Sequence, residues 1–113
     1  MEFPEGMARL ESQEQFETQI LNPKGVTVPT YVCILFSAEW CGPCKKLDKE
    51  ALLRTHRDIV WYGCDVDENG YTHGYCGLQK IPSFAFIKNG RFVDKLQGTI
   101  DLPAINAWID KCR

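Results

Sequence analysis

The apolar residues of this chain recur at helical intervals near both ends and form short continuous runs between them. Ser12 and Gln15 have the spacing of a capping box, and the apolar positions after them predict a helix over residues 13–21. Residues 22–29 are predicted to form a loop. Apolar residues that share one face predict a closing helix after Asp101.

Two continuous apolar runs, at residues 31–36 and 59–66, predict central strands that are buried on both faces. A helix predicted from Cys41 to about residue 55 connects them, so the two strands are expected to run parallel. The runs on either side of Asn89-Gly90 predict an antiparallel hairpin. Residues 67–77 have little apolar signal and predict a short helix or turn.

This order of elements predicts an α/β fold, with a mixed sheet of about five strands and about four helices in a single domain over residues 1–113. The chain has 13 basic and 15 acidic residues, a balance that indicates neither a nucleic acid nor a membrane partner. No apolar run approaches the roughly 20 residues of a membrane span. The opening MEFPEGMARLESQ lacks the features of a secretory signal, which predicts a cytoplasmic protein.

Two of the six cysteines, Cys41 and Cys44, enclose Gly42 and Pro43 where a helix is predicted to follow a central strand. Free backbone N–H groups and the helix dipole at that point favour a thiolate at Cys41. Cys44 lies within the first turn, close enough to form a small disulfide ring, and Pro43 suits a first turn because it needs no hydrogen-bonding N–H. In a reducing compartment this pattern favours a redox couple.

Other readings of the cysteines remain open. The pair could be an inert structural disulfide, or His73 and Cys76 could complete a zinc site with it. Cys33 and Cys64 fall in predicted central strands and are interpreted as small buried hydrophobes. Cys76 is predicted to lie at the surface or half-buried, with a regulatory thiol as the alternative. Three residues are predicted to have no role: Cys112 near the end of the chain, and His56 and His73 on the surface.

Residues 38–45, AEWCGPCK, resemble the active-site signature of the thioredoxin family, and the resemblance extends over nearly the whole chain. FETQIL resembles the first helix of the family, DVDEN the end of its third strand, KIPSF its cis-proline segment, and KNGRFVDKLQG its closing hairpin. The resemblance implies a thioredoxin fold and dithiol–disulfide exchange on protein substrates, with no cofactor and no metal. The Gly-Pro spacer is similar to that of the reducing members.

The resemblance also implies roles for individual residues. Cys41 would attack a substrate disulfide, and Cys44 would resolve the mixed disulfide. Trp40 would shield the pair and offer a flat contact surface, unless it is a boundary aromatic packed on the sheet. Ile81, if the following Pro82 is cis, would turn its backbone toward the sulfurs and could pair with an extended substrate segment. An ordinary trans proline in a loop is the alternative.

Three positions depart from the family's pattern. Leu35 stands where the family usually keeps a buried aspartate, Gly63 where a lysine often faces it, and Lys49 where a proline kinks the helix, so the kink is expected to be absent. Helical spacing places Asp48 on the sheet-facing stripe below Cys44. We expect Asp48 to replace the missing acid and accept the proton of Cys44, with a solvent-facing side chain as the alternative.

The same resemblance implies a role for one residue at the rim of the site and a set of partner proteins. Gly98 is expected to keep the rim flat for a docking backbone, unless it is a plain turn glycine. A thioredoxin reductase is implied as the electron donor, with peroxiredoxins or reductases as clients of a monomer that serves electron transport and cell redox homeostasis. Two alternatives remain: a thioredoxin-like binding module or holdase, and a specialised carrier fed by glutathione or another small dithiol.

Overall fold

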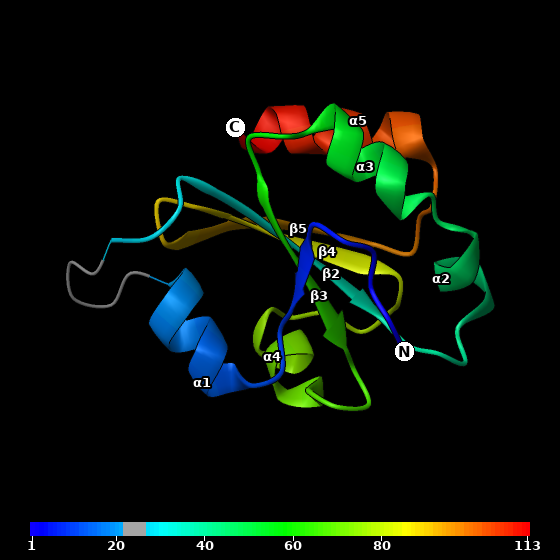
Figure 1. Ribbon diagram of the computed structural model, residues 1–113, viewed down its shortest axis with the longest axis horizontal. Coiled ribbons are helices and arrows are strands. Elements are labelled where there is room, and N and C mark those ends of the chain that lie inside the picture. Colours follow the sequence, from blue (N-terminus) through cyan, green and yellow to red (C-terminus); the bar gives the residue numbers. More distant parts are fainter. Residues whose placement is uncertain (22–26) are drawn as a thin grey trace.

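A computed structural model describes residues 1–21 and 27–113, and over these residues five strands form one mixed sheet in the order β1–β3–β2–β4–β5 (Figure 1). Strands β1, β3 and β2 are parallel, while β4 is antiparallel to β2 and to β5. Both predicted central strands and the hairpin are confirmed. The strands are β1 (Met7–Arg9), β2 (Tyr31–Ser37), β3 (Val60–Asp65), β4 (Ser83–Lys88) and β5 (Arg91–Gln97).

Helices cover both faces of the sheet (Figure 1). On one face lie α1 (Gln13–Gln15), its π-helical continuation η1 (Phe16–Ile20) and α4 (Gly70–Tyr75); on the other lie α3 (Lys49–Thr55) and α5 (Leu102–Cys112). The predicted first and last helices are confirmed, and the predicted loop at 22–29 lies largely outside the described residues. No helix in the described part of the chain is both long and apolar enough to cross a membrane.

Each face of the sheet has its own apolar cluster. Alternate residues of a strand point to opposite faces, so β2 contributes Leu35 to the cluster under α3 and α5, and Ile34 and Phe36 to the cluster under η1 and α4. The continuous apolar run of this strand is therefore the consequence of helices on both faces. At the hairpin, Asn89 and Gly90 have φ angles of 53° and 77°, the left-handed pair that a two-residue turn requires.

The helix predicted from Cys41 to about residue 55 is two helices. The first, α2 (Gly42–Lys46), ends at Leu47, whose backbone is extended. Asp48 then begins α3 as its N-cap residue, because its carboxylate accepts a hydrogen bond from the Ala51 N–H at 3.0 Å. The expectation of an unkinked helix was wrong: a capping side chain interrupts it without a proline.

Two residues predicted to lie on the surface do not. His56 is 4% exposed, with Nε2 at 2.7 Å from Asn106 Oδ1 and Nδ1 at 3.1 Å from Arg113 Nη2, so its ring joins the end of α3 to α5. His73 is half-buried, and its ring centroid lies 5.2 Å from that of Phe36. Neither contact has a signal in the spacing of apolar residues.

Candidate active site

A disulfide joins Cys41 and Cys44 where β2 leads into α2, with their Cα atoms 5.3 Å apart. Cys41 is the N-cap residue of α2, and its Sγ accepts a hydrogen bond from the Cys44 N–H at 3.3 Å. A sulfur that faces the backbone donors of a helix start is favoured as a thiolate once the disulfide is reduced. Cys41 is 5% exposed and Cys44 is 1% exposed, so Cys41 is the more exposed residue of the pair.

Apolar residues surround the cysteine pair. Ala38 is buried with the two cysteines, and Ile81 packs against them. The Ile81–Pro82 bond is cis, as predicted, so the loop before β4 lies beside the disulfide. Gly98 donates its N–H to the Pro82 carbonyl at 2.9 Å with a φ of 75°, a conformation that favours glycine. The backbone at this position therefore accounts for the glycine, and its role in docking stays a prediction.

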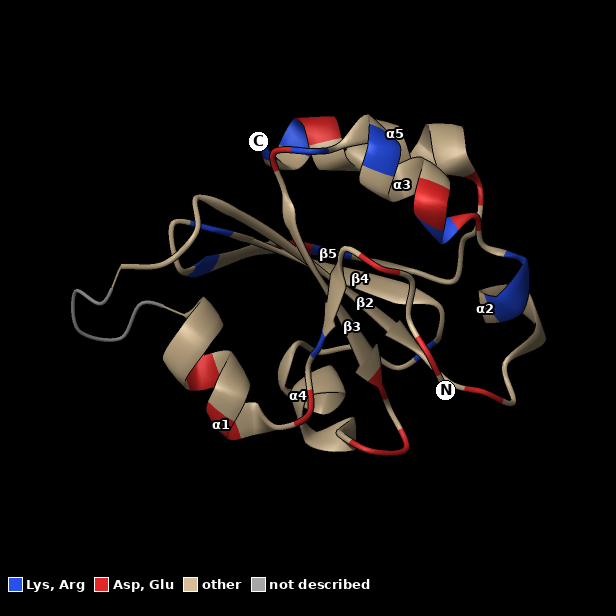
Figure 2. Cartoon of the chain, in the orientation of Figure 1, with Lys and Arg blue, Asp and Glu red and all other residues tan. Residues whose placement is uncertain are grey.

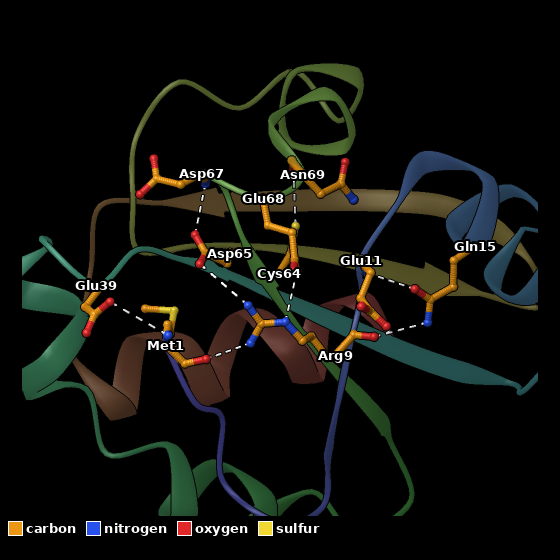
Figure 3. A network of polar contacts seen from close by, with 10 residues as sticks. All are labelled: Met1, Arg9, Glu11, Gln15, Glu39, Cys64, Asp65, Asp67, Glu68 and Asn69. Carbon is orange, nitrogen blue, oxygen red and sulfur yellow. Dashed lines mark hydrogen bonds and ion pairs between the residues drawn. The ribbon is translucent and has the colours of Figure 1, made fainter.

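Trp40 stands at the rim of the site with 68% of its surface exposed. Its indole N–H donates to Asp67 Oδ2 at 2.9 Å, and the Asp67 N–H donates to Asp65 Oδ1 at 2.9 Å. Arg9 holds this loop from the other side, with Nη2 at 3.6 Å from Asp65 and Nε donating to Glu68 at 2.9 Å (Figure 3). The indole is thus fixed in place while its surface remains open, as the predicted contact surface requires.

The network that supports Trp40 was not found from the sequence. In the sequence, the acids of DVDEN only resemble the end of a family strand, and nothing marks Arg9 as part of a site. The available signal was a run of acids directly after a central strand, with a basic residue on the short strand β1 beside it. Because β1 has only three residues, the sequence pattern gave no reason to place Arg9 there.

Leu35 and Gly63, two of the departures from the family's pattern, lie opposite each other in the register of β2 and β3. Leu35 is fully buried in the cluster that includes residues of α3 and α5. A side chain on Gly63 would overlap the ring of Phe3, which packs on the same cluster. Apolar packing therefore fills the positions where an acid and a lysine face each other in the family's pattern.

Asp48 does not lie where the sequence placed it. Its side chain is exposed and caps α3, so the prediction of a buried proton acceptor below Cys44 was wrong. The stripe that suggested it assumed one continuous helix. The side chain that reaches toward the pair is instead Lys49, whose Nζ donates to the Cys44 carbonyl at 2.8 Å. Burial lowers the pKa of Lys49, an effect partly opposed by Glu50.

The Thioredoxin family model matches residues 8–111, which is most of the chain. This chain belongs to the thioredoxin family. The thioredoxin of Equus caballus is 33% identical over 92 residues, which are 80% of this chain and 84% of that protein. Other relatives match over a smaller part of their length: the chain spans 66% of the thioredoxin of Ictalurus punctatus and 22% of a TPR repeat-containing thioredoxin of Oryza sativa.

Solved structures of the thioredoxin family have the same fold. The oxidised mitochondrial thioredoxin 3 of Saccharomyces cerevisiae has a TM-score of 0.79 and 26% identity, covering 93% of this chain and 94% of that chain. A chain from a study of the thiol resolving mechanism in yeast mitochondrial 1-Cys peroxiredoxin via glutathione/thioredoxin systems also has a TM-score of 0.79, with 25% identity and the same coverage. The Cys41–Cys44 disulfide occupies the active-site position of this family of disulfide oxidoreductases.

The other four cysteines of this thioredoxin-family chain are free and buried. This confirms the interpretation of Cys33 and Cys64. The prediction that Cys76 lies at the surface or half-buried was wrong. Cys76 is buried and packs in the cluster under η1 and α4. Burial raises the pKa of Cys64 and of Cys76 to about 12. Among the described residues no group of three or more possible ligands is placed to hold a metal ion.

Proposed function

We propose that this chain is a protein-disulfide reductase that works by thiol–disulfide exchange. In the reduced protein the Cys41 thiolate attacks one sulfur of a substrate disulfide, forms a mixed disulfide and releases the other substrate sulfur as a thiolate. The Cys44 thiolate then attacks Cys41 Sγ, and the bond between Cys41 and the substrate breaks. Both substrate thiolates take up protons from water, so two electrons pass to the substrate and the Cys41–Cys44 disulfide remains.

The position of Cys41 as the N-cap residue of α2 carries this proposal. The helix start supplies a hydrogen bond to its sulfur, and Cys41 is the more exposed of the pair. Cys44 is bonded to it and is almost fully covered, as a thiol that reacts only with its neighbour should be. Gly42 and Pro43 complete the first turn, with Pro43 at a position where no N–H is needed.

The surface around the pair supports a protein substrate. Trp40 offers an exposed, fixed aromatic face at the rim, and aromatic side chains supply large contact areas at interfaces. Ile81 brings a backbone segment next to the disulfide, directly before β4. We propose that an extended substrate segment pairs with Ile81 while it rests on Trp40 and passes Gly98.

The partners are part of the same proposal. Family membership supports a thioredoxin reductase as electron donor, with the chain acting as a monomer in electron transport and cell redox homeostasis. One structural neighbour comes from a study of a 1-Cys peroxiredoxin and the glutathione/thioredoxin systems. It supports a peroxiredoxin as a client and keeps glutathione as the alternative donor.

Insulin reduction with dithiothreitol tests the reaction. The wild-type chain should accelerate the precipitation of reduced insulin, the Cys41→Ser/Cys44→Ser double variant should not, and Cys112→Ala serves as a control that loses a thiol outside the site. Activity retained by the double variant would reject the redox function. If that variant still suppressed aggregation of a third protein while failing to reduce insulin, the chain would also be a holdase.

The donor is tested with the same substrate. The wild-type chain is supplied either with NADPH and a purified thioredoxin reductase or with NADPH, glutathione and glutathione reductase. We expect insulin reduction in the first mixture at a rate well above that in the second. The opposite order would identify a carrier fed by glutathione.

A further inference from the structure

A cavity of about 200 Å³ borders Cys44. Cys44 and Ser37 form part of its wall, together with Lys49 from the start of α3. The cavity thus borders the resolving cysteine. Its volume is sufficient to admit water.

Ser37 is a buried polar residue in the cavity wall. It is the last residue of β2 and is completely buried, yet its Oγ has no hydrogen-bond partner among the described residues. A buried hydroxyl is ordinarily satisfied by protein or by water. Ser37 and Cys44 both line the cavity, so water that enters it would lie next to Cys44.

Lys49 places a positive charge at the same cavity. Its Nζ donates to the carbonyl oxygen of Cys44 at 2.8 Å, so the ammonium is held by the residue whose sulfur reacts. The break between α2 and α3 makes this contact possible, because Lys49 is the first residue of α3 and its side chain reaches back toward α2. In a continuous helix the Cys44 carbonyl would instead accept the backbone N–H of the residue four positions later.

We propose that Lys49 is a positioning residue for the resolving step: its ammonium, fixed at the Cys44 carbonyl, stabilises the Cys44 thiolate that forms when the thiol proton passes to water in the cavity. The inference rests on the proposed function, in which Cys44 resolves the mixed disulfide. It assigns to a cation the help that we expected from the acid at Asp48.

The chemical step is balanced without a further reactant. The Cys44 S–H proton goes to cavity water, and the sulfur electron pair forms the bond to Cys41 Sγ. The bond between Cys41 Sγ and the substrate sulfur breaks, and the substrate leaves as a thiolate that takes up a proton from solvent. A positive charge near Cys44 favours this step because it lowers the free energy of the thiolate relative to the thiol.

Other charged groups also face the cavity, and they largely offset one another. Glu39 lies 3.8 Å from the Met1 amine and is mostly exposed, while Glu2 and Lys45 contribute one charge of each sign. Figure 2 shows α2 as a basic segment beside the start of the chain. Of these groups, Lys49 is the one that is half-buried and bonded to Cys44 itself.

The two exchange steps can be timed separately with dithiobis(nitrobenzoate), a small disulfide that releases one coloured thiolate when Cys41 attacks and a second when Cys44 resolves. Reduced wild-type chain, Lys49→Met and Lys49→Arg are mixed with it in a stopped-flow instrument from pH 6 to 10. Lys46→Met is the matched control, since it removes the same charge from the exposed end of α2. Circular dichroism confirms that each variant is folded.

In Lys49→Met the first phase should stay within about twofold of wild type, while the apparent pKa of the second phase rises by about one pH unit. Ten times fewer thiolates of somewhat higher nucleophilicity should slow the second phase about threefold at pH 7. Lys49→Arg should keep the wild-type profile, and so should Lys46→Met.

Three results would overturn the inference: an unchanged second phase in Lys49→Met, a slower second phase with an unshifted pH profile, or an equal shift in Lys46→Met. A misfolded Lys49→Met leaves Lys49→Arg to decide, because a wild-type profile with arginine supports the charge and a shifted profile contradicts it. Failure of the proposed function would appear differently, as a first phase that survives in Cys41→Ser.

Discussion

The six cysteines of this chain occupy two kinds of environment. Cys41 and Cys44 lie at the start of α2, where a backbone N–H points at the Cys41 sulfur and the two sulfurs are joined. The other four are enclosed in the apolar clusters on the two faces of the sheet. All six are buried by area, so exposure alone does not separate the reactive pair from the rest.

The difference lies in what surrounds each sulfur. Burial among apolar side chains disfavours the thiolate, which is why the pKa of Cys64 and Cys76 rises to about 12 and that of Cys112 to about 11. Near the pair, by contrast, helix-start donors and lysines favour negative charge. The polar groups near each sulfur thus determine whether a cysteine of this fold is reactive or only packs in the core.

The largest expected effect comes from removing the nucleophile. Cys41→Ser should lower the rate of insulin reduction by more than about a thousandfold, because it removes the thiolate that attacks the substrate. Cys64→Ala and Cys76→Ala should keep activity within about twofold after correction for the folded fraction. Comparable losses in the two groups would remove the distinction between them.

Alkylation of the reduced, folded protein should separate the two groups next. At pH 7 iodoacetamide should modify Cys41 at least about a hundredfold faster than Cys64 or Cys76, since a thiol with a pKa near 12 is almost entirely protonated. Peptide mapping by mass spectrometry at timed intervals measures each site. Early modification of Cys76 would show that its cluster opens readily and would restore the regulatory alternative.

Alkaline pH should weaken the fold through the buried thiols. The pKa of Cys76 is raised in the folded state, so the unfolded chain loses the thiol proton at a lower pH than the folded chain does. The protonated thiol therefore stabilises the fold fully below about pH 8.5, and this stabilisation is lost as the pH rises toward 12. Each such thiol should contribute a fall of about 1.4 kcal/mol per pH unit in the free energy of unfolding. Urea titrations of the oxidised protein between pH 8 and 10.5 should show a shallower fall for Cys76→Ala. Parallel curves would contradict the assignment.

The smallest effect concerns Asp48, which lies near the pair but belongs to the fold. Asp48→Ala removes the cap of α3 and should lower the free energy of unfolding by about 1 kcal/mol, whereas Asp48→Asn keeps a capping side chain and should change it by only a few tenths. Neither should alter the rate at which Cys44 resolves a mixed disulfide. Slower resolution in Asp48→Asn would instead support Asp48 as the proton acceptor for Cys44.

Much of the fold could be predicted because its signals are local. Continuous apolar runs predicted β2 and β3, Asn89-Gly90 predicted the turn, and the cysteine spacing predicted a reactive helix start. The cis Pro82 came from the family resemblance rather than from the residues alone. The cytoplasmic location, the single domain over residues 1–113 and the monomeric state stay predictions.

The missed features depend on contacts between distant segments or on competition within a turn. The periodicity through Leu47 and Ala51 fits one helix, yet the Asp48 side chain ends that helix by capping the next. Phe3 explains Gly63 only once β1 is placed beside β3. Lys49 stands where the family has a proline, and the sequence suggests no other role for it. Its contact with the Cys44 carbonyl depends on the break between α2 and α3, which the apolar periodicity does not indicate.

The most direct test of the central claim, that Cys41 attacks and Cys44 resolves, is to identify the mixed disulfide itself. Cys44→Ser, Cys41→Ser and wild-type chains are incubated with oxidised insulin, quenched with acid and mapped by mass spectrometry without reduction. A covalent adduct should accumulate in Cys44→Ser, with the substrate sulfur on Cys41, and none should accumulate in the other two. An adduct on Cys44 in Cys41→Ser, or a substrate sulfur on any of the four buried cysteines, would contradict the account.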